Sequence, residues 1–214
     1  MLTNSQYVRE VKAGLCGKVW FHGLWFDVWP GVYQPAEDTF MLAEAALRQT
    51  PRTALEIGAG CGLVSIMVSR SGCPFTVATD ISLQAIRCAR HNALRLAPGI
   101  HLVLCDLASP LRGRFDLVSF NPPYLISEPN LQPDAAIDGG PDGRRLIDRF
   151  LPLIGSLLSA RGRALMIQSS LNDVEKTVKL AQRLGLEATI LQEQSFFFER
   201  LYLLQLRRDL HRQG

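Results

Sequence analysis

The ten residues 53–62 read TALEIGAGCG, an apolar run that passes directly into alternating glycines. The run predicts a buried strand at residues 54–57, and the apolar residues 63–70 after the glycines predict a helix. Glycines at such a junction let the backbone turn sharply and approach a ligand closely. The stretch therefore predicts a strand–turn–helix unit with a ligand site at the turn.

Strands and helices alternate after this unit. We expect strands at residues 75–80, 101–105, 116–120 and 164–168, and helices at residues 82–96, 144–159 and 172–184. Such alternation is typical of a parallel sheet with helices on both faces. Two final strands, at residues 187–192 and 201–206, have no helix between them and predict an antiparallel hairpin. The pattern predicts a doubly wound, mostly parallel α/β sheet of seven strands whose last strand is antiparallel.

An aromatic segment precedes this domain. Residues 19–29 alternate aromatic with small or polar side chains, which predicts a β-hairpin with its turn at His22-Gly23. Packing against the main domain is the interpretation we favour over a stacking platform for bases. We therefore expect an N-terminal extension at residues 1–32 and a single main domain at residues 33–214.

Composition excludes several classes of protein. The 214 residues are 47% hydrophobic and 20% charged, enough for a substantial core. A formal charge of +3 is too small to indicate a nucleic-acid partner. The five cysteines are scattered and odd in number, which predicts no metal site and fits the reducing cytoplasm. The first thirty residues contain no uninterrupted apolar segment, so we expect a soluble protein without a membrane partner.

The glycine turn and its neighbouring acids predict a nucleoside cofactor. Asp80 ends the second expected strand, about where nucleoside-binding folds keep an acid for the ribose hydroxyls. Gly58 and Gly60 belong to an alternating pattern that differs from the dinucleotide fingerprint. Glu56 directly precedes the turn, where a carboxylate repels a pyrophosphate but suits a cationic amino-acid group. Helix capping or turn formation is the alternative role for Asp80.

A second motif, Asn121-Pro122-Pro123-Tyr124, follows the fourth expected strand. Its two prolines remove two backbone donors and fix φ, so the carbonyl of Pro122 can stay aimed at a substrate. Asn121 adds a second acceptor and Tyr124 a flat apolar wall. A planar NH2 group held on both acceptors would keep its lone pair directed at an electrophile. The alternative is an ordinary strand exit capped by prolines.

Taken together, these motifs resemble the class I S-adenosylmethionine-dependent methyltransferases, over residues 53–207. The resemblance implies S-adenosyl-L-methionine as cofactor and a Rossmann-like fold. In that family an acid at the end of the second strand holds the ribose and an acid after the third lies by adenine. These roles fall on Asp80 and Asp106, and Ile81 and Leu107 would flank the adenine ring. Turn formation or helix capping is again the alternative for both acids.

Three further segments narrow the resemblance to HemK-type enzymes. Residues 33–40 (YQPAEDTF) and 197–203 (FFERLYL) are similar to the archaeal and eukaryotic HemK-like branch. Residues 138–143 (DGGPDG) resemble the glycine-rich stretch of HemK-type enzymes generally. Members of this family methylate the glutamine of the Gly-Gly-Gln motif of peptide chain release factors. The resemblance therefore implies a release-factor glutamine methyltransferase.

The same resemblance implies roles for single residues. Asn121, Pro122 and Tyr124 would form the catalytic turn, and Thr39 and Asn121 would lie beside the cofactor. The alternative substrates are an adenine or guanine exocyclic amine of a nucleic acid, with Tyr124 stacking on a flipped base, and a protein lysine. A non-catalytic scaffold is the alternative outside enzymes. No dense basic patch appears near residues 125–143, which is against a nucleic acid.

Two segments are candidates for contacts with other proteins. In the HemK-like branch a small zinc-binding activator subunit commonly pairs with the edge strand beside the cofactor, which falls on residues 101–105. Ordinary sheet packing is the alternative for this strand. Residues 125–143 form a long segment without helical or strand periodicity, and loops of that length are usually functional. We expect this segment to close over the substrate.

Overall fold

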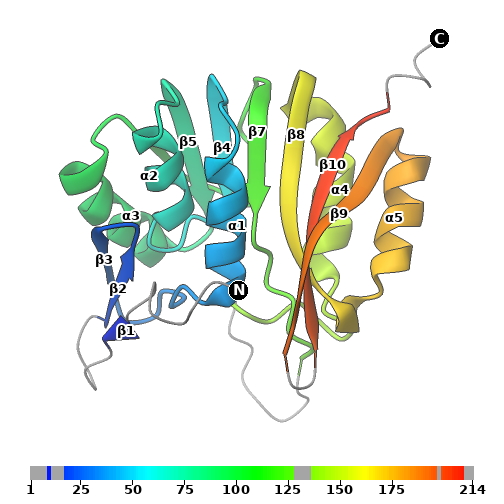
Figure 1. Cartoon of the computed structure of the whole chain (residues 1–214), viewed down its shortest axis with the longest axis horizontal. Helices are drawn as coiled ribbons and strands as arrows, with labels where there is room; N and C mark the ends of the chain where they lie inside the picture. The colour runs from blue at the N-terminus through cyan, green and yellow to red at the C-terminus, as the bar shows by residue number, and fades with distance from the viewer. Residues whose placement is uncertain (1–8, 11–16, 128–135, 197–198, 210–214) are drawn as a thin grey trace.

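The computed structural model describes residues 9–10, 17–127, 136–196 and 199–209. A seven-stranded sheet in the order β6-β5-β4-β7-β8-β10-β9 forms its centre (Figure 1). The strands are β4 (Thr53–Ile57), β5 (Phe75–Asp80), β6 (His101–Leu104), β7 (Phe115–Phe120), β8 (Leu158–Ser169), β9 (Leu186–Ser195) and β10 (Arg200–Arg208). Strands β4 to β8 pair in parallel, and β10 is antiparallel to both of its neighbours. The predicted sheet with its antiparallel last strand is confirmed.

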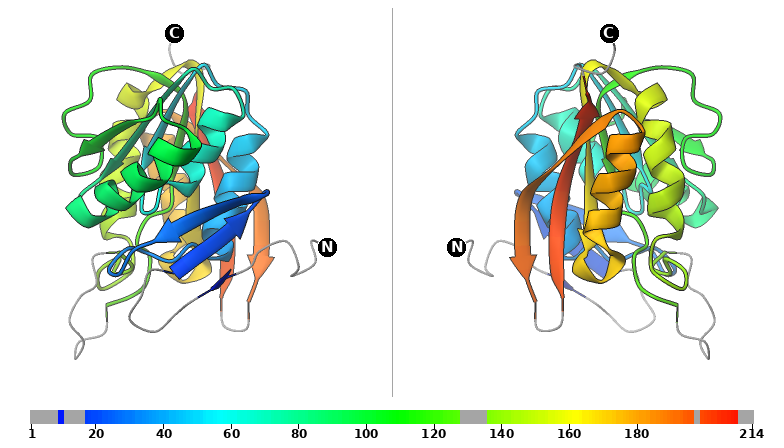
Figure 2. Two further views of the ribbon diagram at one scale, coloured as in Figure 1. Left: turned by 90° about the vertical axis from the view of Figure 1, so that its left-hand side faces the viewer. Right: turned by 90° about the vertical axis from the view of Figure 1, so that its right-hand side faces the viewer.

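Helices cover both faces of the sheet (Figure 2). They are α1 (Glu37–Leu47), α2 (Leu63–Arg70), α3 (Leu83–Leu96), α4 (Arg145–Leu157) and α5 (Val174–Arg183). One hydrophobic core lies between the sheet and α1 and α2, and a second lies between the sheet and α4 and α5. The chain reverses its winding between β4 and β7, so a crevice for ligands is expected at the carboxyl ends of these strands. Within the described ranges, no helix is long and apolar enough to cross a membrane.

The predicted N-terminal hairpin is present as β2 (Gly17–Phe21) and β3 (Leu24–Val28). Its turn residues, His22 and Gly23, both have positive φ values of 47° and 81°, as a two-residue hairpin turn requires. Alternate side chains of the hairpin are buried in the same core as α1. A two-residue strand, β1 (Arg9–Glu10), adds to β2; it is too short to produce a sequence pattern.

The largest departure from the expected bounds is in β8, while the other elements differ by a few residues at most. Strand β8 starts at Leu158, directly at the end of α4, and not at residue 164. Leu158 pairs with Phe115, and the register then shifts before Leu117 pairs with Arg163. A Cβ at Gly162 would lie 2.5 Å from the carbonyl oxygen of Phe115. The polar and charged residues before 164 interrupt the apolar pattern and hide this irregular start. The close approach at Gly162 requires a residue without a Cβ.

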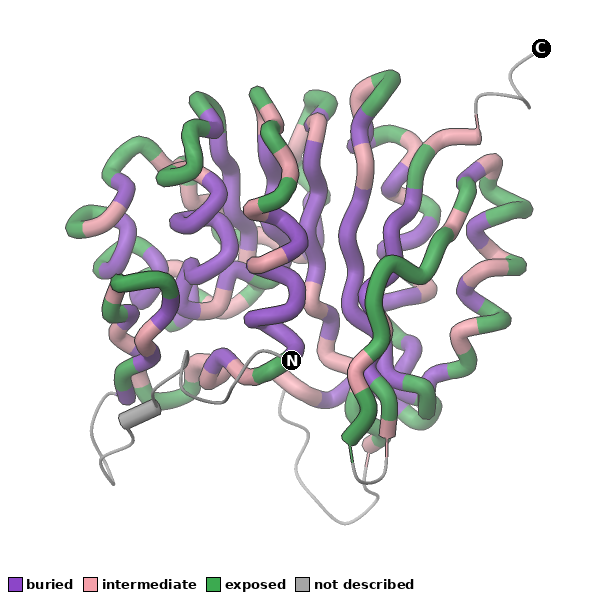
Figure 3. Tube along the Cα trace, viewed as in Figure 1, coloured by how far each residue is buried: buried purple, intermediate pink, exposed green. Residues whose placement is uncertain are grey.

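Both edges of the sheet are open in the described part of the chain. Strand β6 pairs only with β5, and β9 pairs only with β10. The predicted edge strand at residues 101–105 is thus an edge, with His101 and Leu104 exposed. Strand β9 is exposed along most of its length (Figure 3).

Candidate functional site

A cavity of about 420 Å³ opens at the carboxyl edge of the parallel strands. Segments far apart in the sequence line it: residues 31–39 before and at the start of α1, the turn after β4, the ends of β5 and β6, the turn after β7, residues 136–137 and the first turns of α4. All of the predicted site residues line this one cavity. They are Thr39, Glu56, Gly58, Gly60, Asp80, Ile81, Asp106, Leu107, Asn121, Pro122 and Tyr124.

The glycine turn after β4 has the conformation that its composition predicts. Gly58, Gly60 and Gly62 have φ values of 72°, 54° and 84°, which side chains with a Cβ rarely adopt. The N–H group of Ala59 donates to the carbonyl of Thr79 at 2.8 Å and ties the turn to β5. Bare backbone therefore faces the cavity beside the end of β5.

Asp80 connects the glycine turn to the start of α3. One carboxylate oxygen accepts from the N–H of Gly60 at 3.0 Å, and the other accepts from the N–H of Ser82 at 2.8 Å. Burial raises the pKa of Asp80, and these backbone hydrogen bonds oppose the rise. Asp80 therefore stabilises the glycine turn and the start of α3, and the same carboxylate also lines the cavity.

Glu56 is a buried carboxylate at the base of the cavity. Its Oε2 accepts from the N–H of Ser65 at 2.8 Å, which satisfies a donor in the first turn of α2. Burial, the main cause, raises the pKa of Glu56 to about 8, and the charge of Asp80 adds to the rise. A cation bound in the cavity would lower this pKa, so the site favours a positively charged group.

The far end of the cavity holds an ion pair that the sequence did not predict. Asp106 and Arg149 of α4 lie 2.6 Å apart, and both side chains are about half exposed. Leu107 has a positive φ of 51°, uncommon for such a residue, and its carbonyl accepts from the hydroxyl of Thr79 at 2.7 Å. Ile81 is 65% exposed at the rim. Ile81, Leu107 and this ion pair thus line the cavity beside the ends of β5 and β6.

The turn after β7 presents an unsatisfied acceptor. The Nδ2 group of Asn121 donates to the hydroxyl of Thr39 at 3.4 Å. Its Oδ1 atom is buried and accepts no hydrogen bond from the described residues. A buried polar atom without a partner costs free energy, so it marks a place where a ligand donor is expected. Pro122 and Pro123 follow and supply no N–H group that could occupy it.

Asp38 is a site residue that sequence reasoning missed. It is 2% exposed, and its Oδ2 accepts from the hydroxyls of Tyr33 at 2.8 Å and Tyr124 at 3.1 Å. In the sequence Asp38 looks like an ordinary acid in the first turn of a helix. Tyr33 and Tyr124 are the only sequence features that point to Asp38, and the sequence does not show that their hydroxyls meet at one carboxylate.

The glycine-rich residues 138–143 pack against the backbone of the candidate catalytic turn. Asn172 donates through Nδ2 to the carbonyl of Tyr124 at 2.9 Å. A Cβ at Gly143 would lie 2.1 Å from that same Nδ2 and 2.3 Å from the Tyr124 carbonyl. Leu125 bridges to Asp138, and this bridge joins the two ends of the long segment. Its middle, residues 128–135, lies outside the described residues, so the expected closure over a substrate stays a prediction.

Comparisons with known proteins identify the family. The model of the methyltransferase small domain matches residues 30–136. A putative protein N5-glutamine methyltransferase of Methanocaldococcus jannaschii is 33% identical over 186 residues, which cover 85% of this chain and 94% of the relative. The chain belongs to the HemK-like methyltransferases. Human methyltransferase HEMK2 is 35% identical, with 79% of this chain and 86% of the relative covered.

A solved structure resembles this HemK-like methyltransferase over most of its length. It is the Mtq2-Trm112 complex of E. cuniculi, described as responsible for methylation of the eRF1 translation termination factor. The match has a TM-score of 0.64 and 26% identity, and it covers 83% of this chain and 99% of the other. The family fixes S-adenosyl-L-methionine as the cofactor. The glycine backbone, the buried Glu56 and the strand-end Asp80 suit its nucleoside and its cationic amino-acid group.

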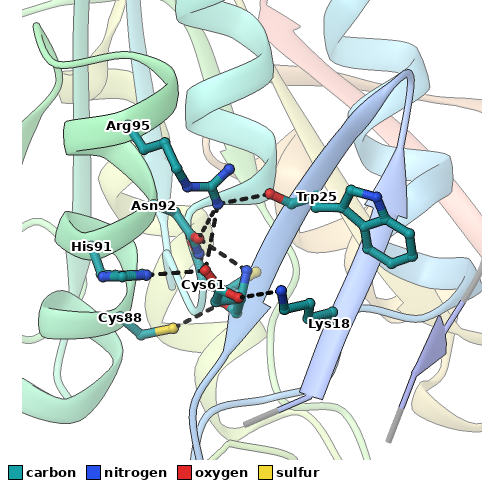
Figure 4. A network of polar contacts seen from close by, with 8 residues as sticks. Lys18, Trp25, Cys61, Cys88, His91, Asn92 and Arg95 are labelled. Carbon is teal, nitrogen blue, oxygen red and sulfur yellow. Dashed lines mark hydrogen bonds and ion pairs between the residues drawn. The ribbon is translucent and has the colours of Figure 1, made fainter.

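The N-terminal hairpin of this HemK-like methyltransferase is held against α3 by a network of polar contacts (Figure 4). Asn92 of α3 is fully buried and donates to the carbonyls of Asp27 and Cys61, at 2.8 Å and 2.9 Å. Its Oδ1 accepts from the N–H of Asp27 at 3.0 Å. Asn92 thus joins the hairpin to the glycine turn, and the hairpin continues into the cavity-lining residues 31–35.

Metal binding finds no support in the described residues. Across these ranges no three His, Cys, Asp or Glu side chains are grouped so that they could hold an ion. Cys61, Cys73 and Cys105 are free thiols.

Proposed function

We propose that this HemK-like methyltransferase methylates a side-chain amide nitrogen, the glutamine of the Gly-Gly-Gln motif of a peptide chain release factor. The observation that carries the proposal is the buried Oδ1 of Asn121, an acceptor that lines the cavity and has no donor in the part of the chain that the structure describes. A primary amide supplies two N–H donors in one plane. One N–H can satisfy Asn121 and the second can satisfy the carbonyl of Pro122.

Two acceptors in these positions would make the amide nitrogen a better nucleophile. Its nitrogen lone pair is delocalised into the carbonyl, and two acceptors that favour a pyramidal nitrogen would develop the lone pair as the transition state forms. The cofactor supplies a methyl group already activated on a sulfonium. Positioning by Asn121, Pro122 and Tyr124 then supplies much of the rate. Methyl transfer to the neutral amide nitrogen gives an N-alkylated amide cation, which is strongly acidic, so its proton can leave to water.

The substrate assignment is supported by the relatives. The relative from M. jannaschii is named for glutamine methylation, and the E. cuniculi complex for methylation of a termination factor. We assign Thr39, Glu56, Gly58, Gly60, Asp80, Ile81, Asp106 and Leu107 to the cofactor because all of them line the same cavity.

The test is transfer of labelled methyl from S-adenosylmethionine to a purified release factor. The control is the same factor with its Gly-Gly-Gln glutamine replaced by asparagine, which keeps an amide but shortens its reach by one methylene. Label that depends on the glutamine supports the proposal. Label on a nucleic-acid amine or a lysine contradicts it. So does no label, with the candidate activator present, from protein shown by calorimetry to bind S-adenosylhomocysteine.

We further propose that a small zinc-binding activator subunit pairs with β6. The strand ends beside Asp106 at the cavity, its outer edge is open, and Leu104 is 51% exposed. An added strand would satisfy the free backbone groups and cover this leucine. Leu104→Lys should abolish co-purification with the activator. Ile190→Lys on the opposite edge strand, a position exposed to 46%, is the matched control and should retain it. Equal effects of the two changes would contradict the proposal.

The remaining proposals concern the cellular location of the protein and its domain boundaries. We propose that the protein works in the cytoplasm, which the free thiols of Cys61, Cys73 and Cys105 support. We also propose that residues 33–214 form the catalytic unit and residues 1–32 an extension. Supporting this division, all of the assigned site residues lie after residue 32.

A further inference from the structure

Asp38 lies at the centre of a hydrogen-bond network on the substrate side of the cavity. Oδ2 accepts from the hydroxyls of Tyr33 and Tyr124, at 2.8 Å and 3.1 Å. Oδ1 accepts from the N–H of Thr39 at 2.6 Å and from its hydroxyl at 3.2 Å. One carboxylate therefore receives donors from the segment before α1, from α1 itself and from the turn after β7.

Thr39 extends the network to Asn121. The hydroxyl of Thr39 accepts from Asn121 Nδ2 at 3.4 Å while it donates to Asp38. This direction matters, because a hydroxyl that gives its proton to a carboxylate keeps its lone pairs for another donor. The Asn121 amide is therefore oriented with its NH2 group toward Thr39, which leaves Oδ1 as the atom without a partner.

Tyr124 is oriented by the same carboxylate. Burial raises the pKa of the Tyr124 hydroxyl, and the nearby charge of Asp38 raises it further. The hydroxyl thus stays protonated and donates to Asp38 at any ordinary pH. The second bond to this turn, from Asn172 to the Tyr124 carbonyl, fixes only its backbone.

The charge of Asp38 is not neutralised by an ion pair. Among the described residues, no Lys, Arg or His lies within ion-pair distance of its carboxylate. A buried carboxylate held only by neutral donors is costly to maintain, and such cost is often associated with function. Asp38 lines the cavity in which positive charge would develop on the substrate nitrogen.

We propose that Asp38 is the positioning residue of the catalytic turn, holding Asn121 through Thr39 and holding Tyr124 directly, so that the free acceptor of Asn121 faces the substrate amide. The inference rests on the proposed function. Asp38 does not touch the substrate, and its contribution is to the transition state, in which the orientation of the acceptor counts most.

The test compares Asp38→Asn with Asp116→Asn. Asp116 is a matched control because its carboxylate accepts from the N–H groups of Arg52 and Thr53 and from the hydroxyl of Ser159, at the opposite end of β7. We expect Asp38→Asn to lower kcat by about tenfold or more, with KM and the Kd for S-adenosylhomocysteine changed less than about threefold. Asp116→Asn should keep kcat within about twofold.

A second readout does not depend on methyl transfer. The side-chain NH2 signals of Asn121, assigned by their loss in Asn121→Asp, should move toward those of a mobile amide in Asp38→Asn and stay unchanged in Asp116→Asn. Failure of the unmodified enzyme to label a glutamine would count against the proposed function alone. An unchanged kcat or unchanged Asn121 signals in Asp38→Asn would overturn the positioning role.

A third comparison applies if Asp38→Asn does not fold. Thr39→Val removes only the hydroxyl between Asp38 and Asn121, and Tyr124→Phe removes only the hydroxyl that reaches Asp38. Both should lower kcat, and Thr39→Val should also mobilise the Asn121 amide. Unchanged kcat in both variants would overturn the proposal.

Discussion

The two polar atoms of the Asn121 side chain have different roles: Nδ2 donates to the hydroxyl of Thr39, and Oδ1 is left for a ligand. Asn121→Ala should therefore lower kcat by about a hundredfold or more, because an acceptor used in the transition state is lost. The Kd for S-adenosylhomocysteine, measured by calorimetry, should change little. Asp80→Ala is the complementary variant and should chiefly weaken cofactor binding. Weaker cofactor binding in Asn121→Ala and a lower kcat alone in Asp80→Ala would contradict both assignments.

Glu56 makes cofactor binding and stability respond to pH in opposite directions. Its pKa is about 8 in the folded protein and ordinarily 4.5, so above pH 4.5 the unfolded chain releases a proton that the folded protein keeps. The free energy of unfolding should fall as pH rises from about 4.5 to about 8. Affinity for a cationic cofactor should rise through the upper part of this range, because the ionised carboxylate attracts the cation.

Glu56→Gln tests both effects because it keeps an acceptor for the N–H of Ser65 and removes the charge. Urea unfolding and calorimetric titration at pH 6 and pH 9 are the measurements. The variant should lose most of the pH dependence in stability and in affinity. Equal pH dependence in the variant and the unmodified protein would assign the effect to another group.

Among the elements, the docked hairpin depends on one buried amide. Asn92→Ala would leave the N–H and carbonyl of Asp27 and the carbonyl of Cys61 without this partner. We expect a loss of about 2–4 kcal/mol in the free energy of unfolding, measured with urea. Arg95→Ala, which removes an exposed donor to the same strand, is the control and should cost clearly less. A similar cost for both would mean that Asn92 is not the main anchor.

The glycine-rich segment before α4 allows a second close contact between elements. Gly143→Ala should destabilise the protein and lower kcat, because the Cβ would collide with Asn172 and with the carbonyl of Tyr124 in a residue whose φ is 68°. Gly99→Ala is the control, since nothing lies within 4 Å of its Cβ position and its φ is not left-handed. Thermal unfolding and initial rates would show the difference. Retention of kcat in Gly143→Ala would argue against support of the catalytic turn by this segment.

On the scale of the whole molecule, ligand binding should stabilise one edge of the sheet. At about 100 times its Kd, S-adenosylhomocysteine should add about 2.7 kcal/mol to the free energy of unfolding. Beyond this global effect, exchange should slow most at the backbone N–H groups of residues 58–61, Asn121 and Tyr124, which line the cavity. Equal local protection at residues 70–74, at the amino edge, would place the ligand elsewhere.

Local patterns in the sequence predict most of this architecture. The apolar strands, the glycine turn and the Asn-Pro-Pro-Tyr turn are each contained in a few consecutive residues, so their structures follow from local rules. The contacts of Asp38 with Tyr124 and of Asp106 with Arg149 join residues 86 and 43 positions apart. Such contacts depend on how the strands and helices pack together, and this packing cannot be predicted from a short sequence pattern.

All of the assigned chemistry lies at the carboxyl edge of the sheet, and this leaves the amino edge available for engineering. The turn between α2 and β5 is one example, because Ser71 and Gly72 are exposed and Gly72 has no atom within 4 Å of its Cβ position. A fluorescent dye or an inserted peptide tag there would report on the protein from the side opposite to catalysis. Immobilisation through the same turn would leave the mouth of the cavity open to a large substrate.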